Sequence, residues 1–162
     1  MRDTKYKNGF SLIEVLIAVV LVGLAITALL VANSSFTIAN GAGTDLSTAE
    51  FLIEQIRELT AMLPVIDPQS STTTFGPEET NLADYDDLDD FDDANLSPPI
   101  NTNRELLNDF AAFSQQVTVE NVNPTDFEQV VSDHSSHFVR VTAKVFLNTK
   151  EISSARWIRA RY

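Results

Sequence analysis

The sequence predicts an α+β fold in which one long N-terminal helix packs on a small antiparallel β-sheet. Three observations predict it. The run Phe10–Ala32 is apolar or small except for Glu14. Apolar residues then recur at steps of three and four residues as far as Leu63, which is the helical period. Every second residue from Val139 to Leu147 is apolar, which is the period of a half-buried strand.

The first half of the helix, residues 10–32, has the length and composition of a membrane span. At 1.5 Å per residue it would be about 34 Å long, slightly more than the ~30 Å hydrocarbon core of a bilayer. The leader before it, residues 1–9, carries Arg2, Lys5 and Lys7. Since a basic flank favours the cytoplasmic side, we expect a single pass with a cytoplasmic N-terminus.

Glu14 is the only charged residue in this span. A carboxylate costs roughly 2.5 to 3.5 kcal/mol toward the centre of a bilayer, so its presence there indicates a function. The span contains no basic residue that could pair with it. We therefore expect its partner to be a positive charge from another chain.

The sequence Gly9-Phe10-Ser11-Leu12-Ile13-Glu14-Val15-Leu16-Ile17-Ala18 resembles the N-terminal signature of type IV pilins and type II secretion pseudopilins. The resemblance implies that a prepilin peptidase cuts between Gly9 and Phe10 and then methylates the new amine of Phe10. It also implies that Glu14 meets the Phe10 amine of a neighbouring subunit in a filament. The implied architecture is the pilin fold.

The same resemblance implies where the chain resides and what it contacts. The precursor would lie in the inner membrane, surrounded by lipid, with its C-terminal domain in the periplasm. Assembly would involve other pilin subunits and an inner-membrane platform. The product would be a pilus or a pseudopilus, with the cell surface as one destination.

The rest of the chain divides into three predicted segments. Residues 33–63 continue the helix as an amphipathic half that forms the core of the domain. Residues 64–102 contain most of the prolines and predict a Pro/Asp-rich loop. Residues 103–162 predict a short helix over 103–113, with Thr102 and Glu105 as a capping box, followed by three or four antiparallel strands.

The loop contains a run of aspartates interrupted by Tyr85, Leu88 and Phe91. Two interpretations remain open. The run forms a solvated turn or a single helical turn whose apolar residues dock on the domain, or its carboxylates bind a hard cation such as Ca²⁺. The candidate ligands are Asp84, Asp86, Asp87, Asp89, Asp90, Asp92 and Asp93. A similar acidic stretch occurs in minor pilins that resemble those of the mannose-sensitive haemagglutinin pilus.

Composition excludes several classes of function. The chain has no cysteine, so disulfides, thiolate metal sites and cysteine nucleophiles are absent. Its net charge of −12 argues against binding nucleic acid, because phosphate contacts need basic residues. The sequence also lacks a phosphate-binding loop, a nucleophile elbow and an HExxH motif, so we do not expect an enzyme.

The sequence therefore predicts a minor pilin-like subunit that is cleaved after Gly9, N-methylated at Phe10 and assembled through helix packing and a Glu14–amine contact. A type II secretion pseudopilin is the close alternative. A membrane-anchored periplasmic binding module that is never processed, or a calcium-dependent adhesin, is the alternative from a different class. Calcium is the candidate ion, and no other cofactor is expected.

Overall fold

The computed structural model describes residues 9–67 and 74–161. The chain divides into two compact units, Met1–Gly43 and Thr44–Tyr162, which we describe separately. Most of the predicted leader falls on residues 1–8, and part of the predicted loop falls on residues 68–73. Both segments lie outside the described residues.

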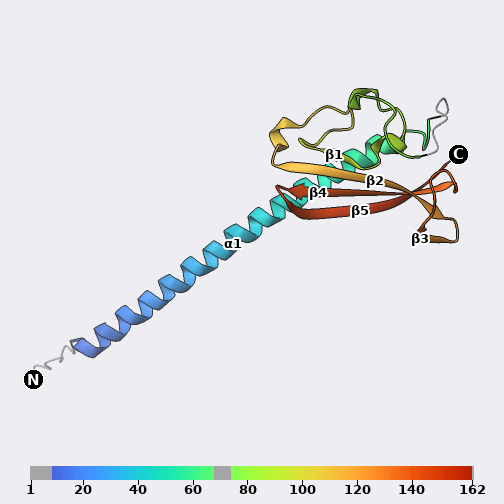
Figure 1. The fold of residues 1–162 in the computed structure, drawn as a ribbon. Helices are drawn as coiled ribbons and strands as arrows, with labels where there is room; N and C mark the ends of the chain where they lie inside the picture. Colours follow the sequence, from blue (N-terminus) through green and yellow to red (C-terminus); the bar gives the residue numbers. More distant parts are fainter. Residues whose placement is uncertain (1–8, 68–73, 162) are drawn as a thin grey trace, which may run out of the picture. The chain divides into compact units, whose positions relative to one another are not determined.

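The fold is α+β, as the sequence predicts, with one long apolar helix packed on a small antiparallel sheet (Figure 1). Helix α1 runs from Leu12 to Ala61. In the first unit every described residue is exposed. In the second unit one face of α1 enters the core through Ala49, Leu52, Ile53, Ile56 and Leu59.

Helix α1 ends two residues before the predicted Leu63. Pro64 restricts the backbone of the residue before it and so favours an early end. The carbonyls of the last turn find a partner on the final strand of the sheet. The Arg159 guanidinium donates to the carbonyl oxygens of Thr60 and Leu63, at 3.0 Å for Leu63.

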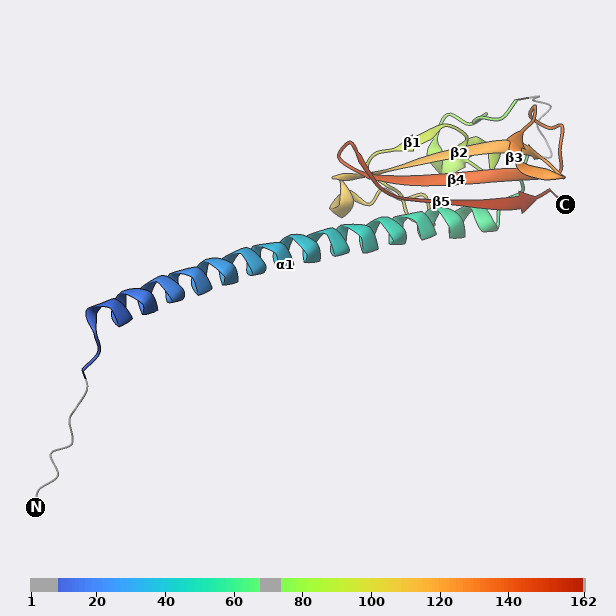
Figure 2. The same cartoon turned by 90° about the horizontal axis from the view of Figure 1, so that it is seen from below.

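Across residues 9–67 and 74–161 the sheet has five strands, all paired antiparallel. Their order is β1-β2-β4-β5, and β3 pairs with β2 off this path. Figures 1 and 2 show β2, β4 and β5 as long, nearly aligned strands. The bounds are β1 Ala94–Leu96, β2 Phe113–Asn123, β3 Asp126–Val130, β4 Phe138–Leu147 and β5 Lys150–Ala160.

Strand β4 confirms the predicted alternation. Its buried residues are Val139, Val141, Ala143 and Val145, and the residues between them are only half-buried. The buried side chains belong to the same apolar core as the inner face of α1. Asn148 forms the turn between β4 and β5 with a φ of 56°, a conformation that asparagine tolerates better than most residues.

A buried glutamine connects the helix, the loop and the sheet. Gln115 on β2 has no exposed surface. Its Oε1 accepts from the N–H of Ile100 at 2.7 Å, and its Nε2 donates to the carbonyl of Leu52 at 2.8 Å and to that of Ile100 at 3.2 Å. All three of these hydrogen bonds go to backbone groups, which explains why a polar residue is accepted in the core.

The predicted helix over residues 103–113 is wrong. Only a short 3₁₀ helix, η3 (Asn108–Phe110), occurs in this segment. The Asn101 Oδ1 accepts from the N–H groups of Asn103 and Glu105 at 2.8 and 3.0 Å, and Arg104 has a φ of 62°. These local bonds from an asparagine side chain compete with helix formation and close a turn instead.

In the described part of the Pro/Asp-rich loop lie two further 3₁₀ helices, η1 (Leu82–Asp84) and η2 (Asp89–Phe91). Strand β1 also falls within the segment predicted as loop. Residues 74–102 therefore contain more regular structure than their composition suggests. Its docking against the domain determines where the aspartates lie.

Candidate functional site

The Gly9–Phe10 peptide bond lies just outside helix α1. Neither residue is helical, and both are exposed, with Phe10 at 83 % of its full accessible surface. A peptide bond outside a helix and open on its surface can reach a peptidase without unfolding a helical turn first. The geometry at these residues is compatible with the predicted cut.

Ser11 and Glu14 cap the first turn of α1 together. The Ser11 Oγ accepts from the N–H of Glu14 at 3.3 Å, and the Glu14 Oε2 accepts from the N–H of Ser11 at 3.5 Å. This reciprocal pair is a capping box, which satisfies backbone donors that have no partner inside the helix. It also places the Glu14 carboxylate at the N-terminal end of the helix, where a negative charge is favoured.

The surface behind this cap is apolar. From Phe10 to Ile38 every large hydrophobic side chain is exposed, and Glu14 is the only charged residue in that stretch. Among the described residues, α1 is the one helix long and apolar enough to cross a membrane, by length and composition alone. A helix with this surface needs lipid or other apolar helices around it.

The Asp-rich loop is docked on the domain by its apolar residues. Leu88 and Phe91 have no exposed surface and belong to the core. Tyr85 packs edge-on against Phe91 with ring centroids 5.2 Å apart. The structure therefore confirms that the apolar residues of the aspartate run dock on the domain.

The seven aspartates do not share one environment. Asp87, Asp89 and Asp90 are buried, at 0, 0 and 1 % exposure. The idea of a fully solvated turn is wrong for these three. Asp84, Asp86 and Asp93 are exposed, and Asp92 is half-buried with its Oδ1 accepting from the N–H of Val119 at 2.7 Å.

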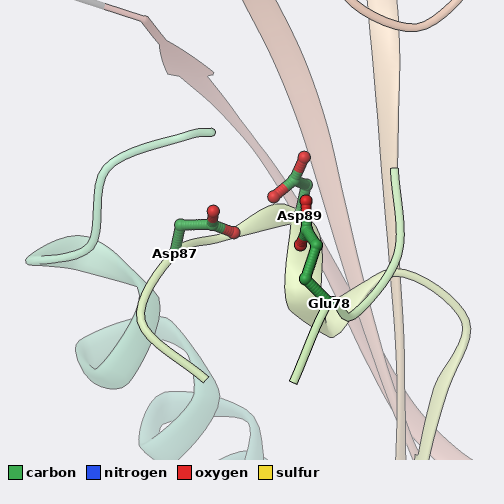
Figure 3. Close-up of side chains that lie close together, drawn as sticks. All are labelled: Glu78, Asp87 and Asp89. Atoms are coloured by element: carbon green, nitrogen blue, oxygen red, sulfur yellow. The ribbon is translucent and has the colours of Figure 1, made fainter. Parts of the chain in front are cut away.

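Among the residues that the structure describes, three overlapping groups of carboxylates come close enough to share an ion. Within each group the ligand oxygens lie within 4.8 Å of one another. The groups are Glu78–Asp87–Asp89, Glu78–Glu79–Asp90 and Asp86–Asp87–Asp90. Figure 3 shows Asp87 and Glu78 directed toward Asp89 from two segments of the loop. Asp84, Asp92 and Asp93 belong to none of these groups.

The backbone explains how the two segments meet. Gly76 has a φ of 127°, a region that side chains disfavour, and its N–H donates to the carbonyl of Asp89 at 3.1 Å. This turn carries Glu78 and Glu79 to the buried aspartates. The sequence prediction missed both glutamates; the turn signal Gly76-Pro77 just before them was the one available indication.

Burial and mutual repulsion change the acidity of these groups. Burial, with help from the neighbouring Asp87 carboxyl, raises the pKa of Asp89 to about 9. Burial also raises the pKa of Asp87. At the rim, the Asp90 carboxyl within hydrogen-bonding reach raises the pKa of Glu79 to about 7. Without a cation, the cluster therefore retains protons at neutral pH.

The start of the chain combines three features: an exposed apolar helix from Leu12 onward, a capped first turn, and one carboxylate, Glu14, between Phe10 and Ile38. Residues 4–30 match the family model described as the prokaryotic N-terminal methylation motif. This match supports a pilin or pseudopilin type of protein, a structural rather than an enzymatic class. No curated protein and no solved structure matches the chain.

Proposed function

We propose that the chain is a minor pilin-like subunit of a type IV pilus-like filament. A prepilin peptidase cleaves it after Gly9 and methylates the amine of Phe10. The mature subunit leaves the inner membrane and packs its apolar helix among the helices of other subunits. The Glu14 carboxylate then receives the Phe10 amine of a neighbour.

The observation that carries this proposal is the lone Glu14 on an exposed apolar helix that matches the methylation motif at residues 4–30. In an apolar surrounding, opposite charges attract far more strongly than in water. Burying both ions is costly, however, so the pair contributes register more than net stability. A misplaced subunit would leave a carboxylate or an amine buried without a partner, which costs more free energy than burying the pair.

Exchange of lipid for protein contacts is nearly neutral for the apolar surface itself, because lipid tails are as apolar as the side chains. Helix packing and the charge pair must therefore give assembly its direction. Assembly also requires an inner-membrane platform that supplies the energy for extraction. The globular domain remains outside the cytoplasm throughout.

The test is the mass of the N-terminal peptide of the chain purified from its own membrane. The proposal expects a peptide that begins at Phe10 and carries one added methyl group. A strain without prepilin peptidase serves as the control and should yield the intact leader. A chain that keeps residues 1–9 in the presence of the peptidase would instead be an anchored periplasmic module and would overturn the proposal.

A type II secretion pseudopilin is the second candidate, because the methylation motif is common to both. The two differ in the machine they serve. Crosslinking in intact cells, followed by identification of the attached subunits, separates them. Attachment to pilus subunits supports the first candidate, and attachment to secretion-system subunits supports the second.

A further inference from the structure

The acidic cluster of the globular domain contains buried oxygens that no protein donor satisfies. Both side-chain oxygens of Asp89, together with the Oδ2 of Asp87 and the Oδ1 of Asp90, are inaccessible and receive no hydrogen bond from the described residues. Buried carboxylates without a partner are strongly unfavourable. Protons retained by the carboxyls, or a bound cation, must therefore compensate them.

Protein cations do not supply that compensation. In residues 9–67 and 74–161, no ion pair involves Asp87, Asp89 or Asp90. The Arg104 guanidinium donates to the backbone carbonyls of Ala83 and Tyr85. On the sheet, Arg140 and Arg156 both pair with Glu128.

The remaining bonds of the cluster fix its shape. The Asp87 Oδ1 accepts from the N–H of Asp90 at 3.1 Å, and the Asp90 Oδ2 accepts from the N–H groups of Asp86 and Asp87 at 2.9 and 3.3 Å. These bonds use one oxygen of each aspartate and leave the other unpartnered. The Asp89 side chain takes part in none of them, although it is fully buried.

We propose that this cluster is a calcium site, with Asp87 and Asp89 as its buried ligands and Glu78 as its ligand from the rim. Oxygens on opposite sides of Ca²⁺, each about 2.4 Å away, lie about 4.8 Å apart. The ligand oxygens of these three residues lie within 4.8 Å of one another. Carboxylates can bind in a bidentate manner, and water fills the positions that remain among the six to eight that Ca²⁺ requires.

Calcium fits this cluster better than magnesium does. Magnesium demands octahedral geometry at 2.0–2.1 Å and releases its water reluctantly. Here the ligands come from two loop segments at unequal depth, with Glu78 exposed and both aspartates buried. Such a set suits an ion that accepts irregular coordination. The site does not depend on pilus assembly and would be present in an unprocessed chain as well.

The test is thermal unfolding of the full chain in detergent micelles, in chelator and in rising Ca²⁺ at constant ionic strength. With a dissociation constant of about 10⁻⁵–10⁻³ M, Ca²⁺ at ten times that value should raise the Tm by at least about 3 °C. Isothermal titration calorimetry should give one Ca²⁺ per chain. No shift and no binding heat would overturn the site, and an equal shift with Mg²⁺ would overturn its selectivity.

Three variants locate the effect. Asp89→Asn and Glu78→Gln should lose the Tm response to Ca²⁺, and Glu78→Gln keeps the assay usable if the buried variant does not fold, because Glu78 is exposed. Asp93→Asn is the matched control: it removes the same charge from the same loop outside all three carboxylate groups, at a φ of 52° that asparagine accepts. A Ca²⁺ response that survives Glu78→Gln, or is lost in Asp93→Asn, contradicts the ligand set.

Discussion

The Oε2 of Glu14 accepts a hydrogen bond from the backbone N–H of Ser11, while the Ser11 hydroxyl accepts one from the N–H of Glu14. The carboxylate proposed to bind a neighbouring amine is thus also part of the cap of its own helix. The other carboxylate oxygen, Oε1, receives no hydrogen bond in these contacts. It is the atom available to an incoming amine while the cap stays closed.

Substitutions at the cap separate the two roles of Glu14. Glutamine at this position can still close a capping box but has no charge. If charge pairing selects subunits, Glu14→Gln should be excluded from filaments to the same extent as Glu14→Ala. Ser11→Ala, which loses about 0.5–2 kcal/mol of cap stability but keeps the carboxylate, should still be incorporated.

The measurement is the fraction of each variant in sheared filaments relative to the membrane, by immunoblot. Processing at Gly9 is monitored in the same samples, so that a failure of cleavage is not mistaken for a failure of assembly. Glu14→Gln incorporating normally while Ser11→Ala fails would assign Glu14 to capping alone.

Arg159 should stabilise the second unit through the end of α1. Its guanidinium satisfies the carbonyls of Thr60 and Leu63, and a positive charge at a helix C-terminus is also favoured. We expect Arg159→Ala to lower the free energy of unfolding by about 1–3 kcal/mol. Chemical denaturation of the full chain in detergent, followed by near-UV circular dichroism, measures the change.

Arg156→Ala is the control for that experiment. Arg156 lies on the same strand, but it is 57 % exposed and pairs with Glu128, which is 73 % exposed. Exposed pairs contribute little, so its loss should change the free energy of unfolding by less than about 1 kcal/mol. Equal effects of the two substitutions would show that Arg159 has no special role at the helix end.

Gln115 should tolerate no apolar replacement of similar size. Gln115→Leu leaves the N–H of Ile100 buried without its acceptor, and an unsatisfied buried group costs about 1–3 kcal/mol. Gln116→Leu, on the exposed side of the same strand, is the matched control and should be nearly neutral. The measurement is the Tm of both variants under the same conditions. A Gln115→Leu variant with an unchanged Tm would contradict the stabilising role of the Gln115 hydrogen bonds.

Local patterns in this sequence predicted local structure well where nothing distant competed. The alternation in Val139–Leu147 correctly predicts β4, because every second side chain of that strand is buried in the core. The capping-box pattern was less dependable. The sequence predicts a capping box at Thr102 and Glu105, where the Asn101 side chain closes a turn instead. A capping box forms at Ser11 and Glu14.

The acidic cluster shows what a sequence alone cannot provide. All seven aspartates were equal candidates, because spacing says nothing about which carboxylates a docked loop will bury. Burial of Leu88 and Phe91 takes Asp87, Asp89 and Asp90 into the domain and leaves Asp84 and Asp93 outside. Glu78 and Glu79 arrive through the Gly76 turn, a contact set by the folded backbone.

The domain should lose stability as the pH rises when calcium is absent. Folding raises the pKa of Asp89 from 3.8 to about 9 and that of Glu79 from 4.5 to about 7. The folded state therefore binds more protons than the unfolded state above about pH 4. By linkage, this stabilisation is present in full below the ordinary values and is lost as the pH rises toward 9. The carboxyls that face Asp89 are Asp87, Glu78 and Asp90.

The measurement is the Tm in chelator between pH 5 and pH 9, which should fall as the pH rises. Calcium binding requires deprotonated carboxylates, so saturating Ca²⁺ should remove or reverse that slope. Asp89→Asn in chelator should flatten the upper part of the profile, because the amide does not titrate, whereas Asp93→Asn should keep it. A Tm in chelator that rises steadily from pH 5 to pH 9 would mean that the buried carboxyls are ionised and compensated by some other group.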